Sequence, residues 1–125
     1  MTSTTGDSTP VAVARAFTAA WTSGDLDTTA GYVAEDVVFD GPLGHVEGKQ
    51  AYLDGLKGLA QAVDLTGVRV LAAFGDDAQA LIMYDLITKR FGTLRCAKLL
   101  AFSDGRIQTD TLVFDSYEIK KSRDK

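Results

Sequence analysis

The most informative stretch of this chain is residues 37–48, which read Val37-Val38-Phe39-Asp40-Gly41-Pro42-Leu43-Gly44-His45-Val46-Glu47-Gly48. The first three residues are β-branched or aromatic and predict a strand, and Gly41-Pro42 predicts that the backbone leaves it at once. Asp40 is therefore expected at a strand end, beside a Gly-rich loop. It either does chemistry there or caps the following turn. His45, in the loop, has either a surface or hydrogen-bonding role or a catalytic one.

The residues before this stretch predict two helices. Thr9 and Pro10 are typical of an N-cap and a first helical position, and Ser23-Gly24 predicts the end of that helix. Asp25 is expected to cap a second helix, which continues to about residue 35 with Leu26, Ala30 and Val33 on one face. The first helix carries an apolar stripe of Val13, Ala14, Phe17, Ala20 and Trp21.

A third amphipathic helix is expected from Lys49 to Val63. Its inward face comprises Tyr52, Leu53, Leu56, Leu59, Ala60 and Val63. Gly55 and Gly58 lie inside this helix, where each costs roughly 1 kcal/mol relative to Ala. A close approach of the helix to a sheet is the expected compensation.

From Gly67 onward the pattern changes to strands. Four apolar, β-rich runs are separated by connections of hairpin length, and they are Val68 to Phe74, Gln79 to Thr88, Thr93 to Phe102 and Arg106 to Phe114. They predict an antiparallel meander, and the three helices before it would cover one face, which is an α+β arrangement. We expect a flexible leader at residues 1–8, one domain at 9–116 and a solvated, charged tail at 117–125.

Both faces of the expected sheet look apolar. We assign Ile82, Tyr84, Leu86, Leu99 and Val113 to the face without helices. A face exposed to water should carry polar residues, so this one is expected to pack on a second copy of the chain as a homodimer.

The composition restricts the partners. The chain of 125 residues has one cysteine and one histidine, which excludes an intramolecular disulfide and argues against a zinc site, and no cofactor is expected. A net charge of −4, without a basic cluster outside the tail, argues against nucleic acid. Neither a signal peptide nor a membrane span is evident, so a cytoplasmic protein without a membrane partner is expected. A small apolar molecule fits as ligand.

Three segments resemble a known superfamily. They are Phe17-Thr18-Ala19-Ala20-Trp21-Thr22-Ser23-Gly24-Asp25-Leu26-Asp27, Tyr32-Val33-Ala34-Glu35-Asp36-Val37-Val38-Phe39-Asp40-Gly41-Pro42 and Ser103-Asp104-Gly105-Arg106-Ile107. With the order of elements, they make the chain similar to the SnoaL-like and nuclear transport factor 2-like superfamily. The resemblance implies a cystatin-like cone, in which a curved sheet wraps a pocket closed by helices.

Within that superfamily the first two segments are most similar to ketosteroid isomerase. The resemblance implies that Asp40 is the general base, whereas Phe17 stands where the isomerase has its tyrosine and Lys98 where it has a protonated aspartate. Asp110 falls near the acidic position of SnoaL-type cyclases and limonene epoxide hydrolase. The implied catalytic set is therefore Asp40, Lys98 and Asp110. Lys98 and Asp110 also fit a purely structural ion pair, because buried charges are usually paired.

The resemblance further implies the residues of the pocket wall. These are Phe17, Trp21, Tyr52, Leu56, Met83, Asp85, Cys96 and Leu112. Cys96 is expected to act as a small buried hydrophobe. The implied function is an isomerase, cyclase or hydrolase that uses an Asp base on a carbonyl or epoxide compound. The alternative is a non-catalytic ligand-binding or dimeric interaction module of the same fold.

Overall fold

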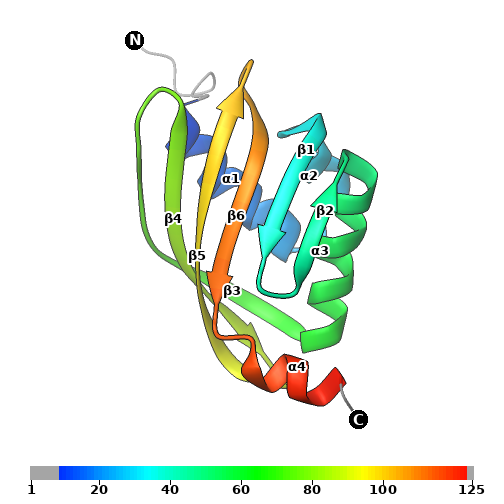
Figure 1. The fold of residues 1–125 in the computed structure, drawn as a ribbon. Coiled ribbons are helices and arrows are strands. Elements are labelled where there is room, and N and C mark those ends of the chain that lie inside the picture. Colours follow the sequence, from blue (N-terminus) through cyan, green and yellow to red (C-terminus); the bar gives the residue numbers. More distant parts are fainter. Residues whose placement is uncertain (1–8, 124–125) are drawn as a thin grey trace.

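The computed structural model describes residues 9–123, so the predicted leader at residues 1–8 lies outside the described range. Figure 1 shows the helices and strands that make up this part of the chain. The helices are α1 (Pro10–Thr22), α2 (Leu26–Ala30), α3 (Lys49–Val63) and α4 (Tyr117–Arg123). The strands are β1 (Val33–Gly41), β2 (Gly44–Glu47), β3 (Leu65–Gly75), β4 (Gln79–Thr88), β5 (Gly92–Ser103) and β6 (Arg106–Phe114). No helix within residues 9–123 is long and apolar enough to cross a membrane.

The strands form one curved sheet in the order β2-β1-β6-β5-β4-β3. β1 is parallel to β6, and every other neighbouring pair is antiparallel. The pairing shifts register in four places, and such bulges bend a strand and increase its twist. Figure 1 shows α1, α2 and α3 gathered on one side of the sheet. The predicted α+β cone with a mostly antiparallel sheet is therefore confirmed.

The first two helices begin at the predicted caps. The Thr9 hydroxyl and the Asp25 carboxylate each accept a hydrogen bond from a backbone N–H of the following turn. However, α2 has only five residues, and the prediction that it continues to about residue 35 is wrong. Val33 lies instead in β1, opposite Ile107, where the sheet buries it completely.

Residues 37–48 form a hairpin rather than a strand followed by a loop. Phe39 on β1 is opposite Val46 on β2, and Asp40 is opposite His45. The sequence does not predict β2, because the strand is short and glycines flank it. Successive residues of a strand point to opposite faces, so Phe39 and Val46 share one face and Asp40 and His45 share the other.

The β4–β5 register decides which residues of β4 face the helices. Tyr84 is opposite Cys96, and Ile82 is opposite the buried Lys98, so even-numbered residues of both strands share the inner face. The prediction that Ile82, Tyr84 and Leu86 point outward is therefore wrong, and all three are buried in the core. Leu99 and Val113 are exposed as predicted.

A fourth helix, α4, follows the last strand. Ile119 of α4 is only 4% exposed, and Arg90 from the β4–β5 connection donates a hydrogen bond to the hydroxyl of Ser122. For residues 117–123, the prediction of a frayed and solvated tail is therefore wrong. Burial of the Ile119 side chain, which contributes roughly 1.5–3 kcal/mol, helps to hold α4 against the rest of the fold.

Candidate functional site

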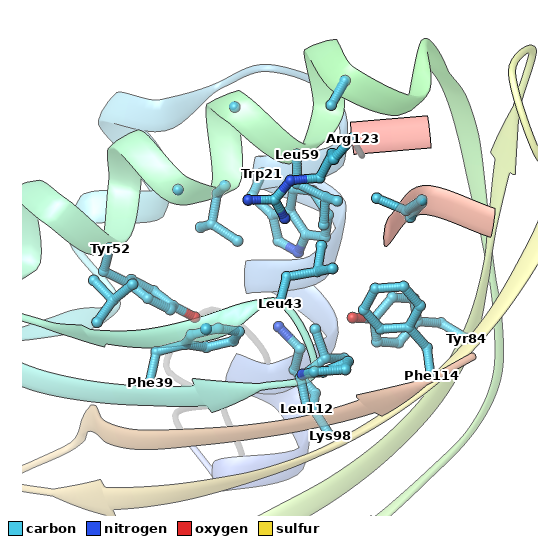
Figure 2. Close-up of a pocket in the computed structure, with 18 residues that line it drawn as sticks. Trp21, Phe39, Leu43, Tyr52, Leu59, Tyr84, Lys98, Leu112, Phe114 and Arg123 are labelled. Carbon is cyan, nitrogen blue, oxygen red and sulfur yellow. The ribbon is translucent and has the colours of Figure 1, made fainter. Parts of the chain in front are cut away.

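A cavity of about 420 Å³ lies between α3, the β1–β2 hairpin and the inner face of the sheet. Its wall is mainly apolar and includes Trp21, Phe39, Leu43, Val46, Tyr52, Leu56, Leu59, Tyr84, Lys98, Leu112, Phe114, Ile119 and Arg123. Figure 2 shows these side chains converging on one space from both helices and strands. The size falls within the usual range of ligand pockets, roughly 300–1,000 Å³.

One charged pair is buried beside this cavity. The amine of Lys98 (1% exposed) donates a hydrogen bond to Oδ2 of Asp110 (0% exposed) at 2.9 Å. The Tyr52 hydroxyl donates to the same oxygen at 2.5 Å. Lys98 and Tyr52 line the cavity, whereas Asp110 lies behind them. The structure thus brings together two of the three predicted catalytic residues, and a ligand would meet the lysine first.

Aromatic rings surround the Lys98 amine. Its Nζ lies 5.3 Å from the ring centroid of Phe17, 5.8 Å from that of Trp21 and 5.9 Å from that of Tyr84. A cation within about 6 Å of an aromatic face is attracted by the ring quadrupole, and more strongly when it is desolvated. The rings and Asp110 together stabilise an ammonium group that burial alone would penalise.

The buried hydroxyl and thiol groups around the pair remain protonated at neutral pH. Burial, reinforced by the charge of Asp110, raises the pKa of Tyr52 well above its ordinary value. Burial raises the pKa of Tyr84 in the same way. Burial also raises the pKa of the Cys96 thiol to about 11, so this cysteine is a poor nucleophile, in keeping with its prediction as a small buried hydrophobe.

Two buried polar atoms here have no hydrogen-bond partner among the described residues. They are Oδ1 of Asp110, which is an acceptor, and Nε1 of Trp21, which is a donor. Leaving such a group unpaired costs roughly 1–3 kcal/mol or more. Trp21 lines the cavity and Asp110 does not, so Nε1 of Trp21 is the natural contact point for a bound molecule.

Asp40 does not reach the cavity. Phe39, the preceding residue, faces inward opposite Asp110, so Asp40 points to the outer face, where its side chain is 64% exposed. Its carboxylate contacts Nδ1 of His45 at 2.7 Å, and Glu47 contacts Nε2 at 2.8 Å. Glu47 and then Asp40 raise the pKa of His45. The prediction that Asp40 is the base of the pocket is therefore wrong.

Four predicted wall residues also lie elsewhere. Met83 and Asp85 belong to the outer face of β4, because even-numbered residues take the inner one. Phe17 and Cys96 are on the inner side but are packed in the core rather than along the cavity. The remaining predictions, Trp21, Tyr52, Leu56 and Leu112, do line it.

Asp85 lies between two arginines on the outer face. Oδ2 accepts a hydrogen bond from Arg69 at 3.0 Å, and Arg95 binds both carboxylate oxygens. Arg95 first and Arg69 second lower the pKa of Asp85 to about 2. The two arginines also cover the carboxylate, which is why a residue on an exposed face shows no exposed side-chain area.

This pairing predicts a pH-dependent stability. The folded-state pKa of Asp85 lies below the ordinary aspartate value of about 3.9. The stability that the pairing contributes is therefore complete above the ordinary pKa and is lost as the pH falls toward 2. We expect Asp85→Asn to be less stable than wild type at neutral pH, with a difference that narrows between about pH 5 and about pH 2. Urea unfolding of both proteins across this pH range measures the difference in stability. A difference that stays constant with pH would contradict the pairing of Asp85 with the two arginines.

The two glycines of α3 face the cavity rather than the sheet. Gly55 and Gly58 both line the cavity, and a Cβ added to either would meet no atom within 4 Å. The prediction that they allow a close approach of the helix to the sheet is therefore wrong. Their missing side chains widen the pocket instead.

A stability gain should follow from filling one of these positions. Gly58→Ala should stabilise the protein by about 0.5–1 kcal/mol in urea unfolding, because Ala loses less backbone entropy in a helix and finds open space here. The matched control is Ala51→Gly, at an exposed position of the same helix, which should lose a similar amount. A destabilised Gly58→Ala variant would show that the site is not open.

Sequence reasoning missed much of the remaining wall. Phe39, Leu43 and Val46 come from the unpredicted hairpin, and Ile119 and Arg123 come from the unpredicted α4. The available signals were weak. Val46 alternates with polar neighbours as a half-buried strand residue does, and Ile119 is the lone aliphatic residue in a charged segment.

Comparison with known proteins gives a consistent family. The model of the SnoaL-like domain matches residues 14–109. A structure from Kribbella flavida DSM 17836 is 32% identical, with a TM-score of 0.85 and coverage of 94% of this chain and 96% of that one. No curated protein matches this chain.

Two further structures are similar in fold. An NTF2-like protein of unknown function from Cytophaga hutchinsonii ATCC 33406 is 19% identical, with a TM-score of 0.74 and coverage of 86% of this chain and 91% of that one. An LEH-like epoxide hydrolase from M. tuberculosis is 22% identical, with a TM-score of 0.72 and coverage of 90% and 86%. At these identities the likeness concerns the fold alone.

Proposed function

Because this chain belongs to the SnoaL-like domain family, we propose that its pocket binds a small, largely apolar molecule through one acceptor oxygen that reaches Lys98. The observation that carries the proposal is an ammonium group buried at the wall of an otherwise apolar cavity. Apolar walls supply affinity through burial, and a single charged donor fixes the orientation of the ligand. One of the three ammonium N–H groups of Lys98 donates a hydrogen bond to Asp110, so the other two remain available to a ligand.

A matched pair of probes tests this proposal. The ketone α-tetralone and the hydrocarbon tetralin have nearly the same shape, but only the ketone offers an oxygen. A hydrogen bond from a charged donor contributes roughly 1.5–3 kcal/mol, so α-tetralone should bind at least about tenfold more tightly. Titration followed by NMR or calorimetry measures both affinities. Equal affinities, or no binding of either probe, would contradict the proposal.

One observation favours catalysis as a second candidate function. Oδ1 of Asp110 accepts no hydrogen bond from the described residues, so this oxygen is free to accept a proton. In such a reaction, Asp110 would take the proton from the carbon next to a carbonyl while Lys98 hydrogen-bonds to the enolate oxygen, and the proton would then return. The position of Asp110 behind Lys98 makes ligand binding the better-supported function.

Deuterium exchange distinguishes these two functions. In D2O, a catalytic protein should exchange the protons next to the carbonyl of α-tetralone faster than buffer does, and Asp110→Asn should abolish the excess rate. Mass spectrometry of the ketone measures the exchange. A rate equal to that of buffer would leave binding as the function of the pocket.

We also propose that the outer face of the sheet pairs two copies of the chain. Six of the seven exposed large hydrophobic residues of the described part lie on β3 to β6, and these are Leu71, Phe74, Leu81, Met83, Leu99 and Val113. Phe74 is opposite Leu81, and Leu81 is opposite Leu99, so the residues form one patch. A patch of this kind is usually an interface, and two-fold pairing of identical chains is the commonest way to bury it.

The mass in solution tests this assembly. Analytical ultracentrifugation at micromolar concentration should give a dimer for wild type and a monomer for Leu81→Glu, because a buried carboxylate without a partner is costly. Tyr117→Glu, an equally drastic change at an exposed position on α4, is the control and should remain dimeric. A monomeric wild type would refute the proposed dimer.

A further inference from the structure

The indole of Trp21 presents an unused hydrogen-bond donor at the pocket. Trp21 lies in the last turn of α1, is 2% exposed and lines the cavity, and no acceptor of the described residues contacts its Nε1. Buried indole N–H groups usually find a partner. If Trp21 served only to fill the core, we would expect a protein group to accept the hydrogen bond from its indole N–H.

The indole ring that carries the unused donor lies close to the Lys98 amine. The centroid of the Trp21 ring is 5.8 Å from Nζ, and both side chains line the cavity. Figure 2 shows the indole nitrogen and the lysine amine directed toward the same part of the pocket. An oxygen atom bound in that part of the pocket would therefore lie near both side chains.

The charges nearby restrict the kind of oxygen. The ammonium is already neutralised by Asp110, whose carboxylate lies 2.9 Å from Nζ, so a ligand carboxylate would face a negative group directly behind its donor. A carbonyl oxygen is neutral and has two lone pairs, which suits two donors that converge from different elements. Its carbon skeleton would fill the apolar remainder of the cavity.

We propose that Trp21 is a ligand-binding residue whose indole N–H, together with Lys98, binds the carbonyl oxygen of a small apolar ketone or aldehyde. This inference rests on the proposed function of the pocket and specifies its ligand class. Trp21 from the first helix and Lys98 from the fifth strand then form a two-donor clamp on one oxygen atom. In this arrangement Tyr52 positions Asp110 and does not touch the ligand oxygen.

The single tryptophan makes a direct test possible, since the spectrum of ¹⁵N-labelled protein contains one indole N–H signal. Saturation with α-tetralone should move this signal downfield and slow its exchange with solvent. Tetralin should fill the same space without either effect. Trp21→Phe keeps an aromatic ring and removes the donor, so it should weaken α-tetralone roughly three- to tenfold while leaving tetralin unchanged.

The outcomes separate this inference from the function on which it rests. If α-tetralone binds more tightly than tetralin but the indole signal responds equally to both, the role of Trp21 is wrong and that of Lys98 stands. If the two probes bind equally well, or neither binds, the proposed function fails and the inference fails with it. The spectrum of the wild-type protein decides between these outcomes even if Trp21→Phe does not fold.

Discussion

Replacing Asp110 with Asn should destabilise the protein by about 3–5 kcal/mol, because it leaves the Lys98 ammonium buried without its counter-charge. Asn has nearly the same shape and still offers an oxygen to Tyr52, so the loss reports the charge rather than a cavity. Urea unfolding monitored by circular dichroism measures the change.

The double variant Lys98→Met/Asp110→Asn should recover most of this loss. A buried ion pair replaced by uncharged residues of similar volume is often neutral or stabilising, because both desolvation costs disappear together. The coupling energy of the double-mutant cycle should exceed about 1.5 kcal/mol. Asp77→Asn, at an exposed position, is the control and should lie within about 0.5 kcal/mol of wild type. Additive losses would show that the two side chains do not act as a pair.

The same double variant should lose the preference for a ligand oxygen. With Met in place of Lys98, the pocket keeps its apolar wall but has no ammonium donor, so the advantage of α-tetralone over tetralin should fall by at least about tenfold. Tetralin should bind as it does to wild type, which the same titration shows.

Asp40→Asn provides the contrasting variant. Because Asp40 lies on the outer face, this substitution should leave the affinities for both probes unchanged. If Asp40→Asn loses α-tetralone binding, Asp40 contacts the ligand after all. If the double variant still prefers α-tetralone over tetralin, Lys98 is not the polar contact of the pocket.

The fold was predictable because several local signals agree. Thr9-Pro10 and Asp25 mark helix starts, the apolar stripe of α1 repeats at helical spacing, and the hairpin-length connections after Gly67 allow only an antiparallel meander. The helix-to-strand boundary after α2 was misplaced because Val33 fits both an amphipathic helix and a buried strand. Tertiary pairing with Ile107 decides between the two.

The site was predictable only where polarity alternates along a strand. On β5, Lys98 is opposite Leu112, and Asp110 is opposite Leu100, so the two charged residues are diagonal neighbours on one face of the sheet. Their opposite charges are the signal that places both of them on the same face. On β1, the run Val37-Val38-Phe39 is apolar at every position, so nothing in the sequence fixes which face Asp40 takes.

β4 is ambiguous for the same reason, since its apolar residues occupy both parities. Asp85 was the available clue. It lies opposite Arg95, and a charged cross-strand pair is typical of a face exposed to water. If the Asp85–Arg95 pair is used to identify the exposed face of β4, Met83 and Asp85 fall on the outer face and Tyr84 falls on the inner face.

The parallel pairing of β1 with β6 has a consequence for the order of folding. Phe39 and Asp110, which are neighbours across this pair, are separated by most of the described chain. Contacts of such long range require the closure of a large loop and slow the folding of a domain. We therefore expect the pocket wall on β1 and the carboxylate behind Lys98 to come together late, so that a partly folded chain holds no ligand. Ligand binding should accordingly slow unfolding rather than speed folding, since the pocket is absent until the last strand has docked.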